Sequence, residues 1–205
     1  DPRTTPEMLM LREAMRGCDA LLNLASLGFG HAPGILSAAR QAGVRRALFI
    51  STTAIFTRLN ARSKRLRLEA EAAIHASGLD WTILRPTMIY GSPRDRNMWR
   101  LVRWLRVFPV VPVFGDGSHL QQPIFVDDVA QAAVSALLDG RAVGHSYNIA
   151  GKFAQPYNQI IDTIATQLNL KAWKVHIPAA PPIFLLRRLE NLGLRLPVKA
   201  EQFER

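Results

Sequence analysis

The stretch Gln41-Ala-Gly-Val-Arg-Arg-Ala-Leu-Phe-Ile-Ser-Thr-Thr53 combines the end of a helix, a short turn and a buried strand. Gly43 is expected to end the helix, because glycine adopts a left-handed backbone conformation without steric cost. The apolar run Ala47–Ser51 then has the length and continuity of a strand that is buried on both faces. Ala76-Ser-Gly-Leu-Asp80 repeats this pattern before a second apolar run, Trp81–Leu84.

The segments around these two strands continue the alternation of helices and strands. Helices are predicted over 6–17, 32–42 and 61–77, and another short apolar strand over Ala20–Ala25. Apolar strands that alternate with helices are typical of a parallel sheet covered on both faces. The sequence therefore predicts the α/β class with a Rossmann-like parallel sheet.

The pattern becomes less regular and richer in proline after Pro86. The elements expected there are a basic amphipathic helix over 97–107, an extended stretch over 108–117, a strand over Ile124–Val126, a helix capped by Asp127 or Asp128 and running to about Leu138, a strand over Ser146–Ala150, a helix over 156–168, a strand over Lys171–Ile177 and a helix over 181–192. We place a boundary near residue 92. Residues 1–92 would form the sheet domain and 93–205 a small substrate-binding lobe, with the strand near 146–150 returning to the main sheet.

The composition is that of a folded globular protein. The 205 residues are 48% hydrophobic and 20% charged, which excludes disordered and collagen-like classes. The longest stretch without Asp, Glu, Lys or Arg, Ala20–Ala39, contains Asn, Gly and Pro and is not a membrane span. The net charge is +10, and 21 of the 26 basic residues are Arg. Such a charge attracts polyanions, but it carries little functional information by itself.

The cysteine and histidine content bears on the cellular compartment and on metal binding. Cys18 is the single cysteine, so no internal disulfide can form, and a reducing, cytoplasmic location is expected. We expect Cys18 to be a small buried residue. No metal site is expected, because the histidines have no metal-ligand spacing; they are His31, His75, His119, His145 and His176.

A glycine-containing loop follows the first predicted strand. Gly28-Phe-Gly-His-Ala-Pro-Gly34 stands between a strand and a helix, as dinucleotide phosphate loops do. However, its spacing is Gly-x-Gly-x-x-x-Gly, and no acid ends the next strand to hold a ribose. A loop beside a cofactor, or a plain tight turn, fits this sequence better than the main pyrophosphate loop.

Hydroxyl groups end the second predicted strand. Ser51, Thr52 and Thr53 would lie at the carboxyl end of a parallel strand, where such sheets bind their ligands. The alternative is a strand end of ordinary β-branched residues. Lys64 begins the next helix within reach of the same crevice, although it could also belong to a basic helix face in which Arg65–Glu69 and Arg67–Glu71 form i,i+4 pairs.

Five motifs resemble the short-chain dehydrogenase/reductase superfamily. They are Leu48-Phe-Ile-Ser-Thr-Thr-Ala-Ile-Phe56, Ser63-Lys64, Thr82-Ile-Leu-Arg-Pro-Thr-Met-Ile-Tyr-Gly91, Phe125-Val-Asp-Asp-Val-Ala130 and Tyr147-Asn-Ile-Ala-Gly151. The match is to the extended and atypical branches, which include NAD-dependent epimerase/dehydratases and reductase-like subunits associated with respiratory complex I. The resemblance covers the chain from about Gly17 to Leu170.

The resemblance implies NAD or NADP as cofactor and a set of site residues. The catalytic positions would be Thr53, Thr52, Lys64 and Asn60, the last at the family's usual tyrosine position. The cofactor-binding positions would be Asn23, Ala25, Ser51, Lys64, Pro86, Met88 and Ile89. The substrate-binding positions would be Tyr90, Arg96, Asn97 and Gln121. The resemblance also implies that the family's first strand and Gly-x-x-Gly-x-x-Gly loop lie upstream of Asp1, so that the Rossmann-like domain is incomplete at its N-terminal side.

Two positions depart from the family pattern. The family base is a tyrosine four residues before the lysine, where this sequence has Asn60, and an amide cannot act as a base. Gln121 stands where many nucleotide-sugar enzymes carry an arginine that binds a diphosphate. The Asp127–Asp128 pair is interpreted as a helix start rather than as a catalytic pair.

Two basic clusters could contact an anionic surface. Five arginines lie within residues 94–106 together with Trp99 and Trp104, and Arg187, Arg188 and Arg195 flank an apolar run. A solvated helix face is the default interpretation, and docking to an anionic membrane or a protein partner is the alternative. Nucleic acid is not expected as a partner, because no nucleic-acid motif accompanies the charge. Contact with a membrane would place the protein at the inner face.

The sequence leads to one main functional hypothesis and two alternatives. The main hypothesis is an NAD(P)-binding epimerase/dehydratase-like oxidoreductase that acts on a carbon–oxygen centre of a small molecule by hydride transfer. The first alternative is a non-catalytic cofactor-binding module, such as a sensor, a chaperone or a membrane-complex subunit. The second is a basic nucleic-acid binder, which rests on charge alone.

Overall fold

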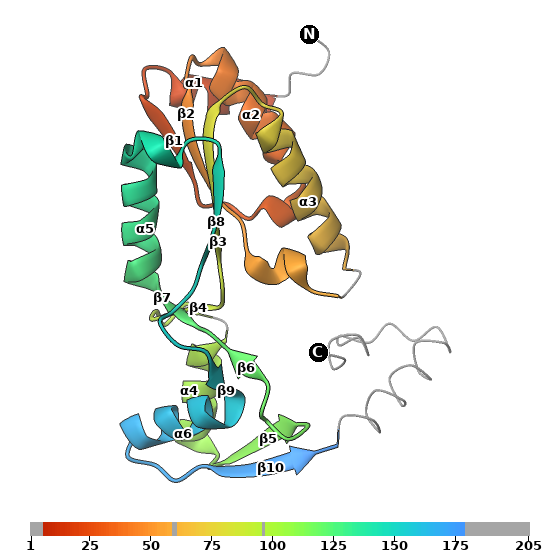
Figure 1. The fold of residues 1–205 in the computed structure, drawn as a ribbon, viewed down its shortest axis with the longest axis vertical. Helices are drawn as coiled ribbons and strands as arrows, with labels where there is room; N and C mark the ends of the chain where they lie inside the picture. Colours follow the sequence, from red (N-terminus) through yellow and green to blue (C-terminus); the bar gives the residue numbers. More distant parts are fainter. Residues whose placement is uncertain (1–5, 59–60, 96, 179–205) are drawn as a thin grey trace, which may run out of the picture. The chain divides into compact units, whose positions relative to one another are not determined.

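The structure is a computed structural model that describes residues 6–58, 61–95 and 97–178 (Figure 1). It divides into two compact units, Asp1–Ile89 with Ile124–Ala150, and Tyr90–Pro123 with Gly151–Arg205. The sequence predicted a boundary near residue 92, with the strand near 146–150 as the only later segment that belongs to the main sheet. In the structure the preceding helix also belongs to the first unit.

The first unit is built around a parallel sheet. Its elements are α1 (Pro6–Met15), β1 (Ala20–Asn23), η1 (Leu27–Phe29), α2 (Ala32–Gln41), β2 (Arg46–Ile50), η2 (Thr53–Phe56), α3 (Arg62–His75), β3 (Asp80–Pro86), α5 (Val126–Leu138), η3 (Gly140–Ala142) and β8 (His145–Ile149). The sheet has the order β1-β2-β3-β8, and every neighbouring pair is parallel. The predicted parallel sheet is therefore confirmed.

Helices cover both faces of this sheet, as predicted. Phe49 and Ile83 point to one face and pack with residues of α1, α2 and α3. Leu48 and Leu84, their neighbours along the two strands, point to the other face and pack against Ala133 of α5. Figure 1 shows α5 on one side of the sheet and α2 and α3 on the other. Burial on both faces explains why these strands are continuously apolar.

The glycines predicted to end α2 and α3 do so in the left-handed conformation. Gly43 has φ +80° and Gly78 has φ +73°, and no atom lies within 4 Å of a Cβ placed on either residue. Conformation rather than space therefore requires glycine at both positions. Each turn leads into a buried strand.

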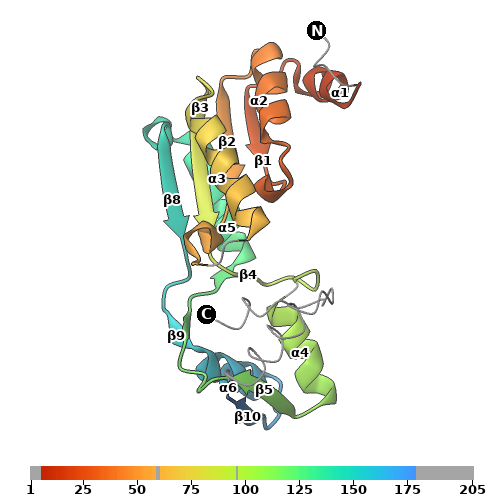
Figure 2. The ribbon, with the colours of Figure 1, turned by 90° about the vertical axis from the view of Figure 1, so that its right-hand side faces the viewer.

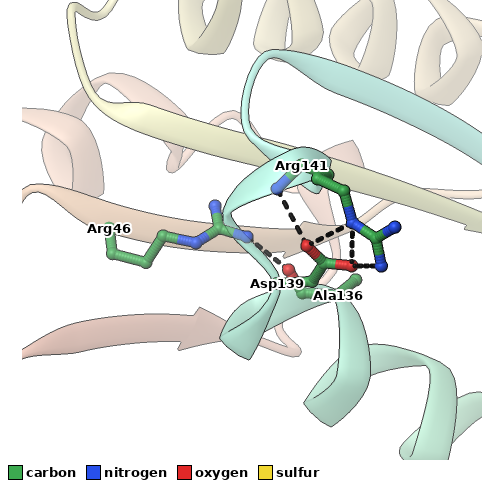
Figure 3. Close-up of polar contacts among 4 residues, drawn as sticks. All are labelled: Arg46, Ala136, Asp139 and Arg141. Atoms are coloured by element: carbon green, nitrogen blue, oxygen red, sulfur yellow. Dashed lines mark hydrogen bonds and ion pairs between the residues drawn. The ribbon is translucent and has the colours of Figure 1, made fainter.

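Arg46 ties α5 to the sheet (Figure 3). Its guanidinium donates to the carbonyl oxygens of Leu137, at 3.0 Å, and Ala136 in the last turn of α5. It also donates to the hydroxyl of Thr82 at 2.9 Å. Burial lowers the pKa of the Arg46 guanidinium. The arginine thus satisfies carbonyl groups that the end of a helix leaves without partners.

Three sequence-based expectations are corrected within the first unit. The helix that contains Asp127 and Asp128 begins at Val126, so both acids lie in its first turn without capping it, where they still favour the positive end of the helix dipole. Cys18 is exposed rather than buried, because it follows the last turn of α1 at the surface. Glu71 does not pair with Arg67, whereas the Arg65–Glu69 pair is present at 3.5 Å.

The second unit packs helices on a small β-ribbon. Its elements are α4 (Met98–Val107), β5 (Val110–Phe114), β6 (Leu120–Gln121), β9 (Gln155–Pro156), α6 (Tyr157–Gln167) and β10 (Trp173–Ile177). β5 and β10 are parallel, with Val110 opposite Trp173. The core consists of Leu105, Val111, Val113 and Ile161. Two further short strands, β4 (Ile89–Tyr90) and β7 (Ile124–Phe125), pair with each other. The helix predicted over 181–192 lies outside the described residues.

Within residues 6–58, 61–95 and 97–178, no helix has the length and apolar character needed to cross a membrane. The same residues contain no cluster of three or more His, Cys, Asp or Glu side chains that could hold a metal ion.

Candidate functional site

The carboxyl ends of β1, β2 and β3 form one edge of the parallel sheet (Figure 2). Asn23 ends β1, Ser51 follows β2, and Pro86 ends β3. The register pairs Asn23 with Phe49 and Ile50 with Leu84, so the predicted site residues of these strands lie along this edge. Open parallel sheets bind their ligands at this edge.

A buried ionic network lies behind this edge. Arg85 donates to both carboxylate oxygens of Glu71, with Nε at 3.1 Å from each and Nη2 at 2.5 Å from Oε2. The Ser51 hydroxyl donates to the same carboxylate, at 2.5 Å from Oε1. Only 5% of the Glu71 side chain and 15% of the Arg85 side chain are exposed. The network fixes the orientation of the Ser51 hydroxyl.

Sequence reasoning missed Glu71 and Arg85 as part of the site. It treated Glu71 as a surface acid because the i,i+4 spacing offered Arg67 as a partner. The available signal was Arg85, a charged residue directly after the apolar run of β3. A positive charge that is removed from water at the end of a buried strand needs an acidic partner, and Glu71 is that partner.

The two threonines have different hydrogen bonds. The Thr52 hydroxyl oxygen accepts the backbone N–H of Ala54 at 3.2 Å and thereby caps η2. The Thr53 hydroxyl donates to the carbonyl oxygen of Pro86 over 3.4 Å, at the long limit for such a bond. The Thr52 hydroxyl therefore keeps its proton available, and the Thr53 hydroxyl could exchange its long bond to Pro86 for a bond to a ligand oxygen.

Lys64 lies in the first turn of α3, as predicted. Its ammonium donates to the carbonyl oxygen of Thr57 at 2.5 Å, so the loop before α3 already provides a partner. Asn60 lies outside the described residues, and its predicted relation to Lys64 stays a prediction.

The loop after β1 is a capped turn. Asn23 is buried, and its side-chain amide donates to the carbonyl oxygen of Ala25 at 3.1 Å. The Ser26 hydroxyl accepts the N–H of Gly28 at 3.2 Å and caps η1, and Gly30 ends η1 with φ +82°. The loop therefore has the geometry of a tight glycine turn, one of the two forms that the sequence favoured.

The remaining predicted residues have mixed surroundings. Met88 and Ile89 are half-buried after β3, and the Met88 carbonyl accepts the N–H of Ile124 at 3.0 Å. Tyr90, Asn97 and Gln121 belong to the second unit. The Gln121 side-chain oxygen is buried, and no described residue donates a hydrogen bond to it. Arg96 lies outside the described residues.

Comparisons with known proteins agree with this architecture. The chain is 32% identical over 118 residues to the mitochondrial NADH dehydrogenase [ubiquinone] 1 alpha subcomplex subunit 9 of Arabidopsis thaliana, an alignment that covers 57% of this chain and 29% of that protein. It is 25% identical over 107 residues to a UDP-glucuronate 4-epimerase of Thermodesulfobacterium geofontis, covering 50% of this chain and 32% of that protein. The aligned stretch thus spans about a third of the length of these curated relatives.

The fold is shared with solved structures of epimerases. The UDP-glucuronic acid 4-epimerase from Bacillus cereus in complex with NAD superposes with a TM-score of 0.73 at 19% identity, covering 86% of this chain and 67% of that one. This likeness confirms the predicted Rossmann-like fold. Residues 7–140 match the model of the protein family described as NAD(P)H-binding, and the chain therefore belongs to that family.

Proposed function

We propose that this chain forms the nicotinamide-side edge of an NAD(P) site in a protein that acts on a carbon–oxygen centre of a small molecule. The observation that supports this most strongly is the buried Glu71–Arg85 pair, which orients Ser51 beside Thr53 at the carboxyl edge of the sheet. Such edges are the ligand sites of this architecture. The Thr52 and Thr53 hydroxyls at the same edge suit the polar groups of a nicotinamide nucleotide.

The residues of the edge would bind and orient rather than react covalently. A bound dinucleotide would supply the hydride chemistry. The Thr53 hydroxyl, which has only a long bond to Pro86, would donate a hydrogen bond to a substrate oxygen. Ser51 would keep a fixed orientation, because its own proton is already donated to Glu71.

A non-catalytic, cofactor-binding role is the second candidate. The observation that favours it is Asn60, four residues before Lys64, where the family's proton-transferring tyrosine would stand. Without an acid at this position, proton transfer to the substrate oxygen loses a contribution of typically about 10²–10⁴-fold. A protein of this kind would bind the cofactor and turn over little substrate.

Two threonine variants test the main proposal. NAD and NADPH are titrated into the protein, and turnover of a panel of UDP-sugars is then measured for Thr53→Val and Thr52→Val. We expect Thr53→Val to lower kcat about tenfold or more, because it removes a donor to the reacting oxygen, and Thr52→Val to change kcat little. Cofactor binding without any turnover would favour the non-catalytic candidate. Absence of cofactor binding would contradict both candidates.

We also propose that the second unit contacts an anionic membrane surface, which would place the protein at the inner face of a membrane. The outward-facing side chains of the β5–β10 ribbon are apolar and exposed: Val110 44%, Phe114 40%, Trp173 69% and Val175 50%. Trp104 of α4 adjoins this surface, because its indole N–H donates to the carbonyl oxygen of Val110 at 2.8 Å. The exposed Arg100, Arg103 and Arg106 of the same helix supply positive charge. Apolar anchors beside arginines suit anionic lipid.

Sedimentation with vesicles tests the membrane proposal. The protein is spun with phosphatidylcholine vesicles, with and without phosphatidylglycerol, and its affinity for duplex DNA is measured at the same salt concentration. We expect binding to the anionic vesicles that Trp173→Ser weakens about tenfold and that Val134→Ser, at an exposed position of α5, leaves unchanged. Tighter binding to DNA, or self-association through the ribbon in place of vesicle binding, would contradict the proposal.

A further inference from the structure

Arg67 is placed against the loop that follows β1. A Cβ atom added to Gly28 would lie 3.1 Å from the Arg67 Cζ and 3.2 Å from Nη2. Gly28 is buried, and its lack of a side chain gives the planar guanidinium this space. A methyl group at residue 28 would force the arginine to move. Gly28 and Arg67 therefore form a fitted pair at the carboxyl edge of the sheet.

Neither acid of α3 neutralises Arg67. Glu69 pairs with Arg65 at the helix surface. Glu71, one turn after Arg67, is occupied by Arg85 and Ser51. Across residues 6–58, 61–95 and 97–178, no hydrogen bond or ion pair joins Arg67 to a partner. Arg67 is half-buried, and the donors of its guanidinium can bind the oxygens of a ligand.

Lys64 is less suited than Arg67 to bind a ligand beside the loop after β1. Its ammonium is bound to the Thr57 carbonyl in the loop before α3, whereas Arg67, three residues later, reaches Gly28. An arginine also differs from a lysine in its chemistry, because its fork of donors can bind two oxygens at once. The structure therefore offers a different cation from the one that the family resemblance implied.

We propose that Arg67, rather than Lys64, is the cation of this chain that binds NAD(P), through the phosphate and ribose oxygens that pass the loop after β1. This inference rests on the proposed cofactor function. The loop provides a suitable setting, because Asn23 is buried and internally bonded and Ser26 caps η1, so the backbone beside Arg67 is held in place. Arg67 would bind the cofactor and take no part in proton transfer.

NMR titration of the full 205-residue chain tests the inference without an activity assay. NAD is added up to millimolar concentrations while backbone amide and arginine Nε–H signals are followed. We expect saturable shifts of Gly28 and of the Arg67 Nε–H. Arg67→Met, which keeps an unbranched side chain, should raise the Kd for NAD about tenfold, the loss expected for one charge-assisted hydrogen bond. The Kd of Arg67→Lys should lie between those of the wild type and Arg67→Met. Added salt should weaken NAD binding to the wild type more than to Arg67→Met.

Two control variants distinguish a specific effect of Arg67 from a general effect of positive charge on α3. Lys64→Ala should change Kd less than about threefold, and Arg65→Ala, at the exposed partner of Glu69, should leave it unchanged. A larger loss in Lys64→Ala than in Arg67→Met would overturn the inference, as would NAD-dependent shifts at Ser51 and Thr53 without any at Gly28 or Arg67. In both cases the proposed cofactor function would stand. Absence of saturable shifts anywhere along the edge would reject the inference and the proposed function together.

Discussion

Loss of the Glu71 charge is expected to destabilise the first unit. Its carboxylate is buried and binds both Arg85 and Ser51. Glu71→Gln leaves the Arg85 charge without its acid in a largely desolvated site. We therefore expect the free energy of unfolding to fall by about 3 kcal/mol, measured by urea denaturation. Glu69→Gln, which removes a surface acid of the same helix, should change it by less than about 0.5 kcal/mol; equal effects would contradict the structural role given to Glu71.

Asn60 decides whether the site can transfer a proton. Asn60→Tyr would restore the family's spacing to Lys64, with one helical turn between the two side chains. We expect it to raise turnover of a carbonyl substrate without weakening NAD binding, because a phenol can donate the proton that an amide cannot. Lys64→Ala in the same background should abolish the gain. Brisk turnover by the native protein, with no change in the variant, would show that another residue is the acid, and Tyr90 would be the first to replace.

The helix ends depend on backbone conformation more than on contacts. Gly43 has a left-handed backbone and open space around its Cβ direction. Gly43→Ala should therefore lower the free energy of unfolding by roughly 1 kcal/mol, the cost of that conformation for an L-residue. Gly140→Ala is the matched control, because residue 140 also has open space but no positive φ. Thermal unfolding should show Gly140→Ala to be neutral or slightly stabilising.

Helix α5 depends on an arginine from a distant strand. Arg46 donates to carbonyl groups in the last turn of α5 and to Thr82 of β3. Arg46→Met keeps the chain length but leaves these acceptors without partners, so we expect destabilisation of about 3 kcal/mol. Arg46→Met should accelerate amide hydrogen exchange in residues 134–138 of α5 more than in α2. Unchanged protection of these residues would show that hydrophobic packing alone holds the helix end.

The whole chain is expected to bind free nicotinamide cofactors weakly. No Gly-x-x-Gly-x-x-Gly loop occurs in its 205 residues, and α2 begins after His31 without a side-chain cap. Phosphate contacts at a helix N-terminus normally anchor the dinucleotide, so the edge described here would supply only part of the binding energy. Calorimetric titration of NAD and NADPH should give affinities weaker than micromolar. Micromolar binding would show that this chain holds the main cofactor contacts.

Local patterns in the sequence determined the layered fold. Apolar continuity in residues 47–51 and 81–84, with Gly43 and Gly78 just before them, predicted parallel strands covered on both faces, because periodicity and glycine conformation act within a few residues. The same patterns placed Ser51, Thr52 and Thr53 at the carboxyl edge of the sheet. Their chemical roles stay predictions, since the sequence supplies the residue types and only a bound ligand would test them.

The partners of the charged side chains were decided by tertiary structure alone. Glu71 lies four residues from Arg67 along a helix, and its ion pair is nevertheless with Arg85 of β3, 14 residues away in sequence. Arg46 likewise bonds to Leu137, 91 residues away. Spacing along a helix limits which side chains can meet at its surface, but a buried charge binds whichever opposite charge the packing brings to it, and that choice depends on contacts between distant segments. For the same reason the contact between Arg67 and Gly28, which forms where α3 packs against the loop after β1, could not be predicted from the sequence.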